Sequence, residues 1–207
     1  MINNILHFFY RRYSFSQEGE DIILNQILND KKSGFYIDIG AHHPVRFSIT
    51  YLFYLKGWRG LNIEADNSKI KFFNFFRKRD HNINALVSTK NSIEKYYRFK
   101  ESALNGILDN KRLEELKLKG IDPIEILEIK SQDINSILSK YSGQNIDFIS
   151  IDIEGKDHEI LSHINLENLR PKVILVERSK DLIKNNYFKK HYEKVFSTSR
   201  NDFFSHR

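Results

Sequence analysis

The sequence contains no cysteine in its 207 residues. A chain without cysteine forms no disulfides, binds no zinc through thiolates and has no cysteine nucleophile. Its chemistry must therefore come from oxygen and nitrogen side chains or from a cofactor. The sequence has only three prolines and nine glycines, so no low-complexity linker is present, and no repeat of solenoid or propeller length occurs.

Long hydrophobic runs are also missing. No stretch reaches the ~18 consecutive apolar residues that a membrane-spanning helix needs. The basic pair Arg11 and Arg12 follows the apolar residues of the N-terminus, which is the reverse of a signal peptide. We therefore expect a cytoplasmic chain without a membrane span.

Hydrophobic residues make up 40% of the sequence, including 16 phenylalanines and 10 tyrosines. This content is enough to fill the core of one domain of this length. We expect residues 1–207 to form a single domain, with residues 1–14 open to interpretation as an N-terminal extension. The lone tryptophan, Trp58, lies between an expected helix and an expected strand and is interpreted as a core residue.

The formal net charge is +6. Clustered Lys and Arg bind polyanions, but here the lysines are scattered, and the one dense basic run, Lys69 to Arg79, is typical of an exposed helix face. We therefore expect no nucleic-acid partner, although an RNA-binding protein or RNA methyltransferase remains an alternative. An anionic substrate such as a nucleotide sugar suits the charge equally well.

Short apolar runs bounded by glycine or turn residues alternate with helical patterns along the chain. Expected helices cover residues 17–29, with Ser16 as N-cap, residues 48–56, a segment begun by Asn67 or Ser68, and a segment from Ser131 to about Tyr141. Expected strands cover residues 35–40, 60–65, 82–87, 146–152 and 171–177, with weaker ones at 96–99 and 125–129 and a terminal antiparallel hairpin at 192–196 and 201–204.

This alternation predicts an α/β fold of the Rossmann-like type. We expect a mostly parallel twisted sheet with helices on both faces and a C-terminal antiparallel hairpin. In such a sheet, ligands bind beyond the carboxyl ends of the strands. Four acidic residues fall at these ends, namely Asp38, Glu64, Asp152 and Glu177.

Asp38 and Glu64 are 64 − 38 = 26 residues apart, about one βαβ unit, so they should end adjacent strands. An acidic residue at the second strand end can accept the ribose hydroxyls of an adenosine, while Gly40 and Ala41 let the backbone approach a ligand closely. The turn from Asp38 to Pro44 lacks the three glycines of a dinucleotide fingerprint, so a pyrophosphate is not expected. S-adenosylmethionine, a nucleoside ligand without a pyrophosphate, meets this description.

Four segments resemble the signature blocks of FkbM-type methyltransferases. They are Phe15-Ser-Gln-Glu-Gly-Glu-Asp21, Tyr36-Ile-Asp-Ile-Gly-Ala-His-His-Pro44, Gly57-Trp-Arg-Gly-Leu-Asn-Ile-Glu-Ala65 and Ile151-Asp-Ile-Glu-Gly155. The resemblance implies S-adenosylmethionine as cofactor and O-methylation of a small acceptor, such as a sugar or nucleotide-linked saccharide of surface polysaccharide synthesis. The candidate cofactor-binding residues are Gln17, Asp38, Gly40, Ala41, His42, Glu64, Ala65, Ser88 and Asp152.

Methyl transfer from a sulfonium requires an aligned acceptor oxygen and a route for its proton. The candidate catalytic residues are Asp152, Glu154 and His43. Asp152 and Glu177, at neighbouring strand ends, could also hold Mg²⁺ or Mn²⁺. Structural alternatives stay open: Asp157 can cap the next helix, His158 can lie on its surface, and His42 and His43 can order their loop.

The Phe-rich segment from Phe72 to Phe76 has apolar residues on too many sides for a simple amphipathic helix. We expect it to pack deeply or to meet another subunit, so a homo-oligomer is an open prediction. A third functional alternative is a non-catalytic member of the fold that binds a partner.

Overall fold

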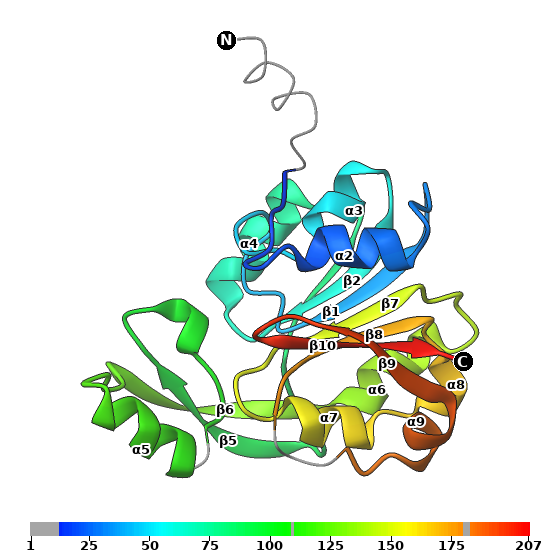
Figure 1. The fold of residues 1–207 in the computed structure, drawn as a ribbon. Coiled ribbons are helices and arrows are strands. Elements are labelled where there is room, and N and C mark those ends of the chain that lie inside the picture. Colours follow the sequence, from blue (N-terminus) through cyan, green and yellow to red (C-terminus); the bar gives the residue numbers. More distant parts are fainter. Residues whose placement is uncertain (1–12, 109, 180–182) are drawn as a thin grey trace, which may run out of the picture.

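The structure is a computed structural model that describes residues 13–108, 110–179 and 183–207 (Figure 1). Residues 1–12 of the expected N-terminal extension lie outside the described residues. The strands are β1 Phe35–Ile39, β2 Arg59–Glu64, β3 His81–Asn84, β4 Leu86–Ser88, β5 Ser92–Arg98, β6 Glu125–Asp133, β7 Phe148–Ile151, β8 Val173–Glu177, β9 Tyr192–Ser197 and β10 Asn201–His206. The α-helices are α2 Glu20–Ile27, α3 Tyr51–Leu55, α4 Asn67–Phe76, α5 Asn110–Leu118, α6 Ile134–Leu138, α7 Asp157–His163, α8 Leu166–Leu169 and α9 Asn186–His191, with 3₁₀ turns at Ser102–Leu104 and Ser139–Tyr141.

Within the described residues, seven strands form one sheet in the order β3-β2-β1-β7-β8-β10-β9. Strands β3, β2, β1, β7 and β8 are parallel, and β10 pairs antiparallel with both β8 and β9. The predicted α/β class, mostly parallel sheet and C-terminal hairpin are therefore confirmed. The chain order reverses between β1 and β7, which makes their carboxyl ends the topological switch point.

Alternate residues of each parallel strand pack into two cores, as the two-residue period of a strand requires. Ile37 and Ile39 belong to the core that contains residues of α6, α7, α8 and α9. Tyr36 belongs to the opposite core, with Phe148 and Trp58. Figure 1 shows α2 and α3 over that second face. The prediction that Trp58 is a core residue is confirmed, since it is 1% exposed.

A second sheet of three strands, in the order β4-β6-β5, lies to one side of the first. The expected strand over residues 82–87 is therefore wrong as a single element, because it divides between the two sheets as β3 and β4. The break falls at Ala85, whose N–H bonds to the Glu64 carbonyl. The weaker strands expected at 96–99 and 125–129 are confirmed within or at the end of β5 and β6.

The helix expected from Ser48 begins at Tyr51, and Asp66 rather than Asn67 or Ser68 caps α4. Two helix starts predicted at other serines are also wrong. Ser16 does not cap α2: its hydroxyl donates to the Asp21 carboxylate, and Gly19 is the N-cap. Further along, β6 continues through Ser131 to Asp133, whose side chain caps α6 by accepting from the Asn135 N–H. In each case the hydroxyl forms a tertiary or turn contact that local spacing does not reveal.

Candidate functional site

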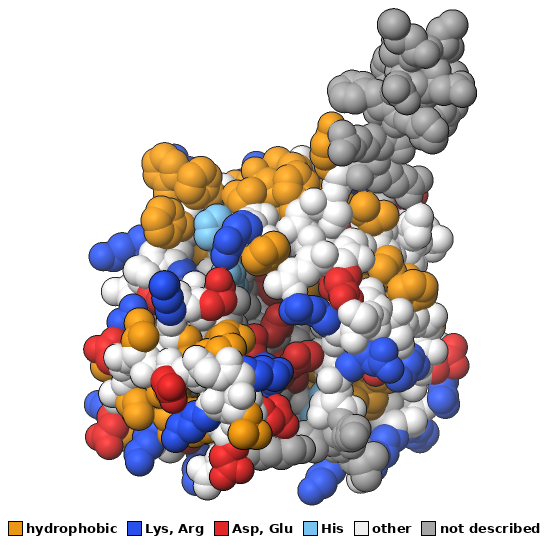
Figure 2. Space-filling view, turned by 60° about the vertical axis from the view of Figure 1, so that its left-hand side comes forward, with side chains coloured by type: hydrophobic (Ala, Val, Ile, Leu, Met, Phe, Trp, Pro, Cys, Tyr) orange, Lys and Arg blue, Asp and Glu red, His pale blue; other side chains and the backbone are white. Residues whose placement is uncertain are grey.

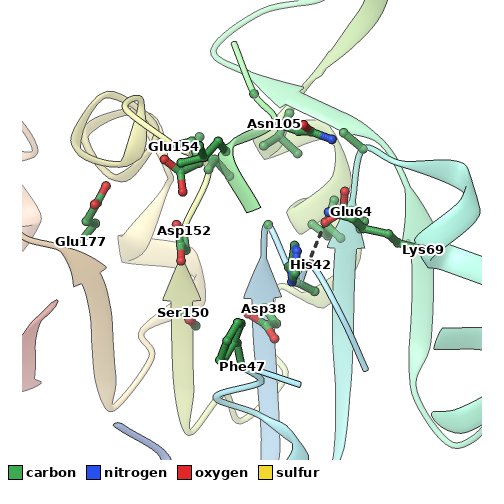
Figure 3. A pocket seen from close by; sticks show the side chains of 18 of the residues that line it. Asp38, His42, Phe47, Glu64, Lys69, Asn105, Ser150, Asp152, Glu154 and Glu177 are labelled. Atoms are coloured by element: carbon green, nitrogen blue, oxygen red, sulfur yellow. Dashed lines mark hydrogen bonds between the residues drawn. The ribbon is translucent and has the colours of Figure 1, made fainter. Parts of the chain in front are cut away.

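A cavity of about 350 Å³ lies at the carboxyl ends of β1, β2 and β7, within the size range of small-molecule sites. Figure 2 shows a hollow on this side with acidic side chains inside it. The residues labelled in Figure 3 come from the main sheet, from the loops after β1 and β7, from α4 and from the segment that follows β5. The predicted strand-end residues Asp38, Glu64, Asp152 and Glu177 all line this one cavity.

Glu64 ends β2 with both carboxylate oxygens oriented by the backbone. Its Oε2 accepts the His42 N–H at 2.8 Å, and its Oε1 accepts the Asp66 N–H at 2.8 Å. Burial raises the pKa of Glu64, and the Lys69 ammonium and these two N–H groups oppose that rise. Each oxygen keeps further acceptor capacity, so the carboxylate presents fixed acceptors to the cavity.

Asp38 lies on β1, with its side chain buried on the α3 side of the sheet. The Thr50 hydroxyl donates to its Oδ2 at 2.9 Å. Burial raises the pKa of Asp38 to about 6, although the Thr50 hydrogen bond and the Arg77 charge act in the opposite direction. Loss of hydration in the folded protein therefore disfavours the charged form of this carboxyl group.

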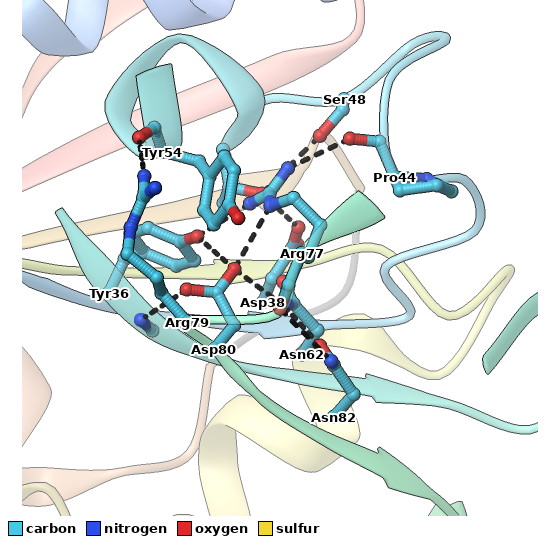
Figure 4. Close-up of polar contacts among 12 residues, drawn as sticks. Tyr36, Asp38, Pro44, Ser48, Tyr54, Asn62, Arg77, Arg79, Asp80 and Asn82 are labelled. Atoms are coloured by element: carbon cyan, nitrogen blue, oxygen red, sulfur yellow. Dashed lines mark hydrogen bonds and ion pairs between the residues drawn. The ribbon is translucent and has the colours of Figure 1, made fainter. Parts of the chain in front are cut away.

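A buried ion pair between Arg77 and Asp80 holds the loop after β1 (Figure 4). Both side chains are fully inaccessible, with Arg77 Nε 2.9 Å from Asp80 Oδ2. The Arg77 guanidinium also donates to the Pro44 carbonyl at 2.8 Å and to the Thr50 hydroxyl at 2.9 Å. Because Thr50 in turn donates to Asp38, the ion pair fixes both the loop and the carboxylate.

The Asp80 carboxylate has three further donors, which compensate its loss of water. They are the Tyr36 hydroxyl at 2.6 Å, the Gly60 N–H at 3.0 Å and the Asn62 amide at 3.1 Å. These donors come from β1 and β2, so the ion pair is also tied to the centre of the sheet.

Gly40 follows β1 with a φ of 82°, a conformation that favours glycine. A Cβ at this position would lie 1.8 Å from the Asp152 carbonyl oxygen. The close approach of the segment after β7 therefore requires a glycine here. This is also the position where the sequence predicts that a ligand comes close to the backbone. Three non-glycine residues that line the cavity also have left-handed φ values, namely His42, Phe47 and Glu154, and such strained backbone is concentrated at functional sites.

A group of carboxylates forms the β7–β8 side of the cavity. Asp152, Asp157 and Glu177 each offer one oxygen, and these oxygens lie within 4.8 Å of one another. Asp157 accepts the N–H groups of Ile153 and Gly155, which fixes the turn after β7. The alternative that Asp157 caps the next helix is wrong, because Asp157 is the first residue of α7 and Lys156 is its N-cap, without a side-chain cap hydrogen bond.

The same carboxylates strongly perturb one another. Asp152 is open to the cavity but enclosed by protein, and this desolvation, together with the charges of Asp157 and Glu154, raises its pKa well above the usual range. Burial, together with the Glu177 charge, raises the pKa of Glu154 to about 7, although Arg112 pairs with it at 3.4 Å. Carboxyl groups that titrate near neutral pH are candidates for proton transfer.

The structure brings most of the remaining predicted residues to the cavity. Gln17, Ala41, His42 and Ala65 all line it. The Gln17 side chain also accepts from Arg200 at 2.8 Å. Burial and the nearby Lys69 charge lower the pKa of His42 to about 4, so its imidazole is neutral at pH 7.

Two predicted residues lie outside the cavity lining. His43 points into its own loop, where Nδ1 accepts the N–H groups of Val45 and Arg46. Ser88 is buried in β4 and paired within the small sheet. The placement therefore supports neither a catalytic role for His43 nor a cofactor contact from Ser88. The alternative of a surface position for His158 is also wrong, since it is buried with Nε2 3.0 Å from the Glu177 carbonyl oxygen.

Several lining residues escaped the sequence prediction. They include Phe47, Lys69, Tyr96, Asn105, Ile107 and Arg200. Tyr96 is in β5, while Asn105 and Ile107 follow it, and they reach the cavity because the small sheet lies beside the main one. No local spacing signals that neighbourhood. For Lys69 a signal existed, since it lies in the first turn of the helix predicted to begin at Asn67 or Ser68, shortly after Glu64.

The fold and the cavity define a Rossmann-like α/β domain whose cavity lies at the β1–β7 switch point, where open α/β sheets bind ligands. A family model described as the methyltransferase FkbM domain matches residues 38–201, and the chain belongs to this methyltransferase family. No curated protein matches significantly. Among solved structures, the METTL16 methyltransferase domain is similar with a TM-score of 0.46 and 12% identity, and the alignment covers 90% of this chain and 65% of that one.

Replacing Asp80 with Ala is expected to lower the free energy of unfolding by about 3–5 kcal/mol, because Arg77 would stay buried without its counter-charge. Urea denaturation at neutral pH measures this change. The control is Glu125→Ala, which removes the partner of the half-exposed Arg98 and should change stability by at most about 1 kcal/mol. Equal losses of stability in the two variants would contradict the stabilising role of the buried ion pair.

Asp38→Asn is expected to stabilise the protein at pH 8 by about 1–3 kcal/mol. The folded state raises the pKa of Asp38 from 3.8 to about 6, so it retains a proton that the unfolded chain releases. The stability contributed by this carboxyl is therefore greatest at low pH and falls between about pH 4 and 6. Urea denaturation from pH 4 to 8 should show the gain in the unfolding free energy of Asp38→Asn only above that window. A gain that is the same at every pH would contradict this prediction.

Proposed function

We propose that the protein is an S-adenosylmethionine-dependent O-methyltransferase. The observation that supports this most is the position of Asp38 and Glu64, which lie on adjacent strands and line one cavity. The orientation of Glu64 suits acceptance of both ribose hydroxyls, while Asp38 and the Gly40–Ala41 backbone suit the methionine end. The sulfonium and ammonium groups of the cofactor are cations, and a carboxylate-rich cavity complements them.

We propose as acceptor a hydroxyl of a sugar or nucleotide-linked saccharide, in the synthesis of a surface polysaccharide. Glu154 and Asp152 would assist removal of the acceptor proton, since a carboxyl with a pKa of about 7 is poised as a general base near neutral pH. Carboxylates also accept hydrogen bonds from the other hydroxyls of such a ligand. Alignment of the acceptor oxygen with the methyl group would supply most of the rate enhancement.

A divalent cation is part of the proposal. Asp152 and Glu177, with Asp157 beside them, offer oxygen donors of the kind that Mg²⁺ and Mn²⁺ prefer. When bound, the ion would lower the pKa of the acceptor hydroxyl.

The wider assignment is also a proposal. It places residues 1–207 in one S-adenosylmethionine-binding domain located in the cytoplasm, with a homo-oligomer as an open prediction. An RNA methyltransferase is a weaker candidate, because the carboxylates in the cavity would repel a phosphate backbone. The same repulsion favours an uncharged sugar over a nucleotide-linked saccharide as the acceptor. A non-catalytic, partner-binding role is weaker too, because the strand-end carboxylates are all present.

Glu64→Ala is expected to weaken the binding of S-adenosylhomocysteine at least about ten-fold, since each lost charge-assisted hydrogen bond contributes about 1.5–3 kcal/mol. Isothermal titration measures the Kd. Glu193→Ala, which changes an exposed carboxylate on β9, should bind like the parent. Circular dichroism and the isosteric Glu64→Gln separate lost contacts from lost folding. No binding of the cofactor or its product to the folded parent at millimolar concentration would refute the proposal.

The metal proposal predicts that the parent binds Mn²⁺ and that Glu177→Gln and Asp152→Asn weaken this binding at least about ten-fold, because each removes a charged oxygen ligand. The electron paramagnetic resonance signal of free Mn²⁺ measures the bound fraction without any acceptor. Glu193→Gln is the matched control. Unchanged Mn²⁺ signals in the presence of excess parent protein would exclude the metal.

A further inference from the structure

Helix α4 carries three exposed phenylalanines on one side. Phe72, Phe75 and Phe76 are 54%, 66% and 47% exposed, whereas Phe73 and Ile70 of the same helix are buried. Their spacing of three and four residues places the exposed rings together. We call these three residues the α4 face. This placement partly corrects the expectation of deep packing for residues 72–76, and clustered exposed apolar side chains mark interaction surfaces.

The cations around the α4 face have no acidic neighbours in the sequence. Between Asp66, which caps the helix, and Asp80, which is buried against Arg77, the segment contains no Asp or Glu. Lys71 and Lys78 are exposed. Lys78 Nζ lies 5.5 Å from the centre of the Phe75 ring. Aromatic rings and cations therefore share one surface.

Aromatic and basic side chains also lie near the described start of the chain. The Arg79 guanidinium lies 3.9 Å from the Tyr54 ring centre, and Leu55 beside it is 56% exposed. Figure 1 shows the described chain beginning at the end of the molecule that carries α3 and α4, and Tyr13 there is 62% exposed. In sequence, Tyr13 is preceded by Phe8-Phe9-Tyr10-Arg11-Arg12.

The α4 face also borders the cavity. The Phe72 ring stacks on His43 with centroids 6.5 Å apart, and His43 belongs to the loop after β1. In that loop Arg46 lies 4.6 Å from the centre of the Phe47 ring, and Phe47 lines the cavity. Figure 2 shows hydrophobic side chains gathered at the end of the molecule next to the acidic hollow.

We propose that the α4 face docks the protein peripherally on an anionic lipid bilayer. Aromatic rings that enter the headgroup region, surrounded by Lys and Arg, are the chemistry of interfacial binding to anionic lipids. Among the described residues no helix is long and apolar enough to cross a bilayer, so the contact lies at the surface. Docking in this way sets the cavity beside the lipid surface, where an acceptor carried on a lipid would reach it.

The charge pattern favours a bilayer over a second copy of the chain. In a two-fold symmetric dimer the same patch meets itself, so Lys71, Lys78 and Arg79 of one copy would face those of the other without compensating carboxylates on α4. An anionic surface instead neutralises these cations while it accepts the rings. The proposal does not depend on methyl transfer.

The test is sedimentation of the full chain with vesicles of phosphatidylcholine alone or mixed equally with phosphatidylglycerol. We expect binding to the mixed vesicles, weaker binding to phosphatidylcholine alone, and release by salt. The double variants F72S/F75S and K71E/K78E should each bind the mixed vesicles at least about ten-fold more weakly. I93S/I126S, which removes two exposed apolar side chains from the small sheet, should bind like the parent.

Three results would overturn the proposal. They are no binding of the parent to the mixed vesicles, equal binding of parent and F72S/F75S, and a dimer in sedimentation velocity that F72S/F75S dissociates, which would make a second copy the occupant. Melting temperatures confirm that each variant is folded. Titration with S-adenosylhomocysteine in the same preparations shows separately whether the cofactor proposal stands.

Discussion

The ion pair between Arg77 and Asp80 is the interaction on which the arrangement of the candidate site depends. Two charges without any contact with water are stable only when nearly every donor and acceptor has a partner, and here Asp80 accepts from β1 and β2 while Arg77 donates to Pro44 and Thr50. A shift of the loop after β1 would leave part of a buried charge unpaired. The loop is thereby held in the conformation in which the His42 N–H meets Glu64 and Thr50 meets Asp38.

The cavity contains several carboxyl groups whose charged form is disfavoured in the folded protein. Desolvation and neighbouring carboxylates raise the pKa values of Asp38, Glu154 and Asp152, so these groups lower the stability of the protein at neutral pH. A cationic ligand would stabilise the charged form of these carboxylates on binding. This stabilisation would contribute to the free energy of binding. Strained or destabilised groups of this kind are typical of functional sites. The same reasoning applies to a cationic cofactor and to a divalent ion.

Residues of the main sheet and of the small sheet both line this cavity. The main sheet and the segment after β7 provide the carboxylates, and the segment after β5 provides Asn105 (Figure 3) and Ile107. The bridge between Tyr97 and Gly106 holds that segment beside the small sheet, and a Cβ on Gly106 would come within 3.2 Å of the Glu154 side chain. The segment held by the small sheet therefore shapes the part of the cavity beside Glu154, which the proposal places near the acceptor.

The sequence by itself determined the parallel core of the fold and the carboxylates at its edge. Runs such as residues 35–40 and 146–152 are apolar on both faces, and parallel strands must align their carboxyl ends, so Asp38, Glu64, Asp152 and Glu177 could be assigned to one edge without a structure. Only the tertiary structure decided the division of residues 82–87 between two sheets, the inward turn of His43 and the exposure of Phe72 and Phe75. The division of residues 82–87 and the exposure of the two rings depend on packing between residues distant in sequence, which no local pattern records. His43 turns inward through the nearby N–H groups of Val45 and Arg46, in a loop held by distant contacts such as Arg77 with Pro44.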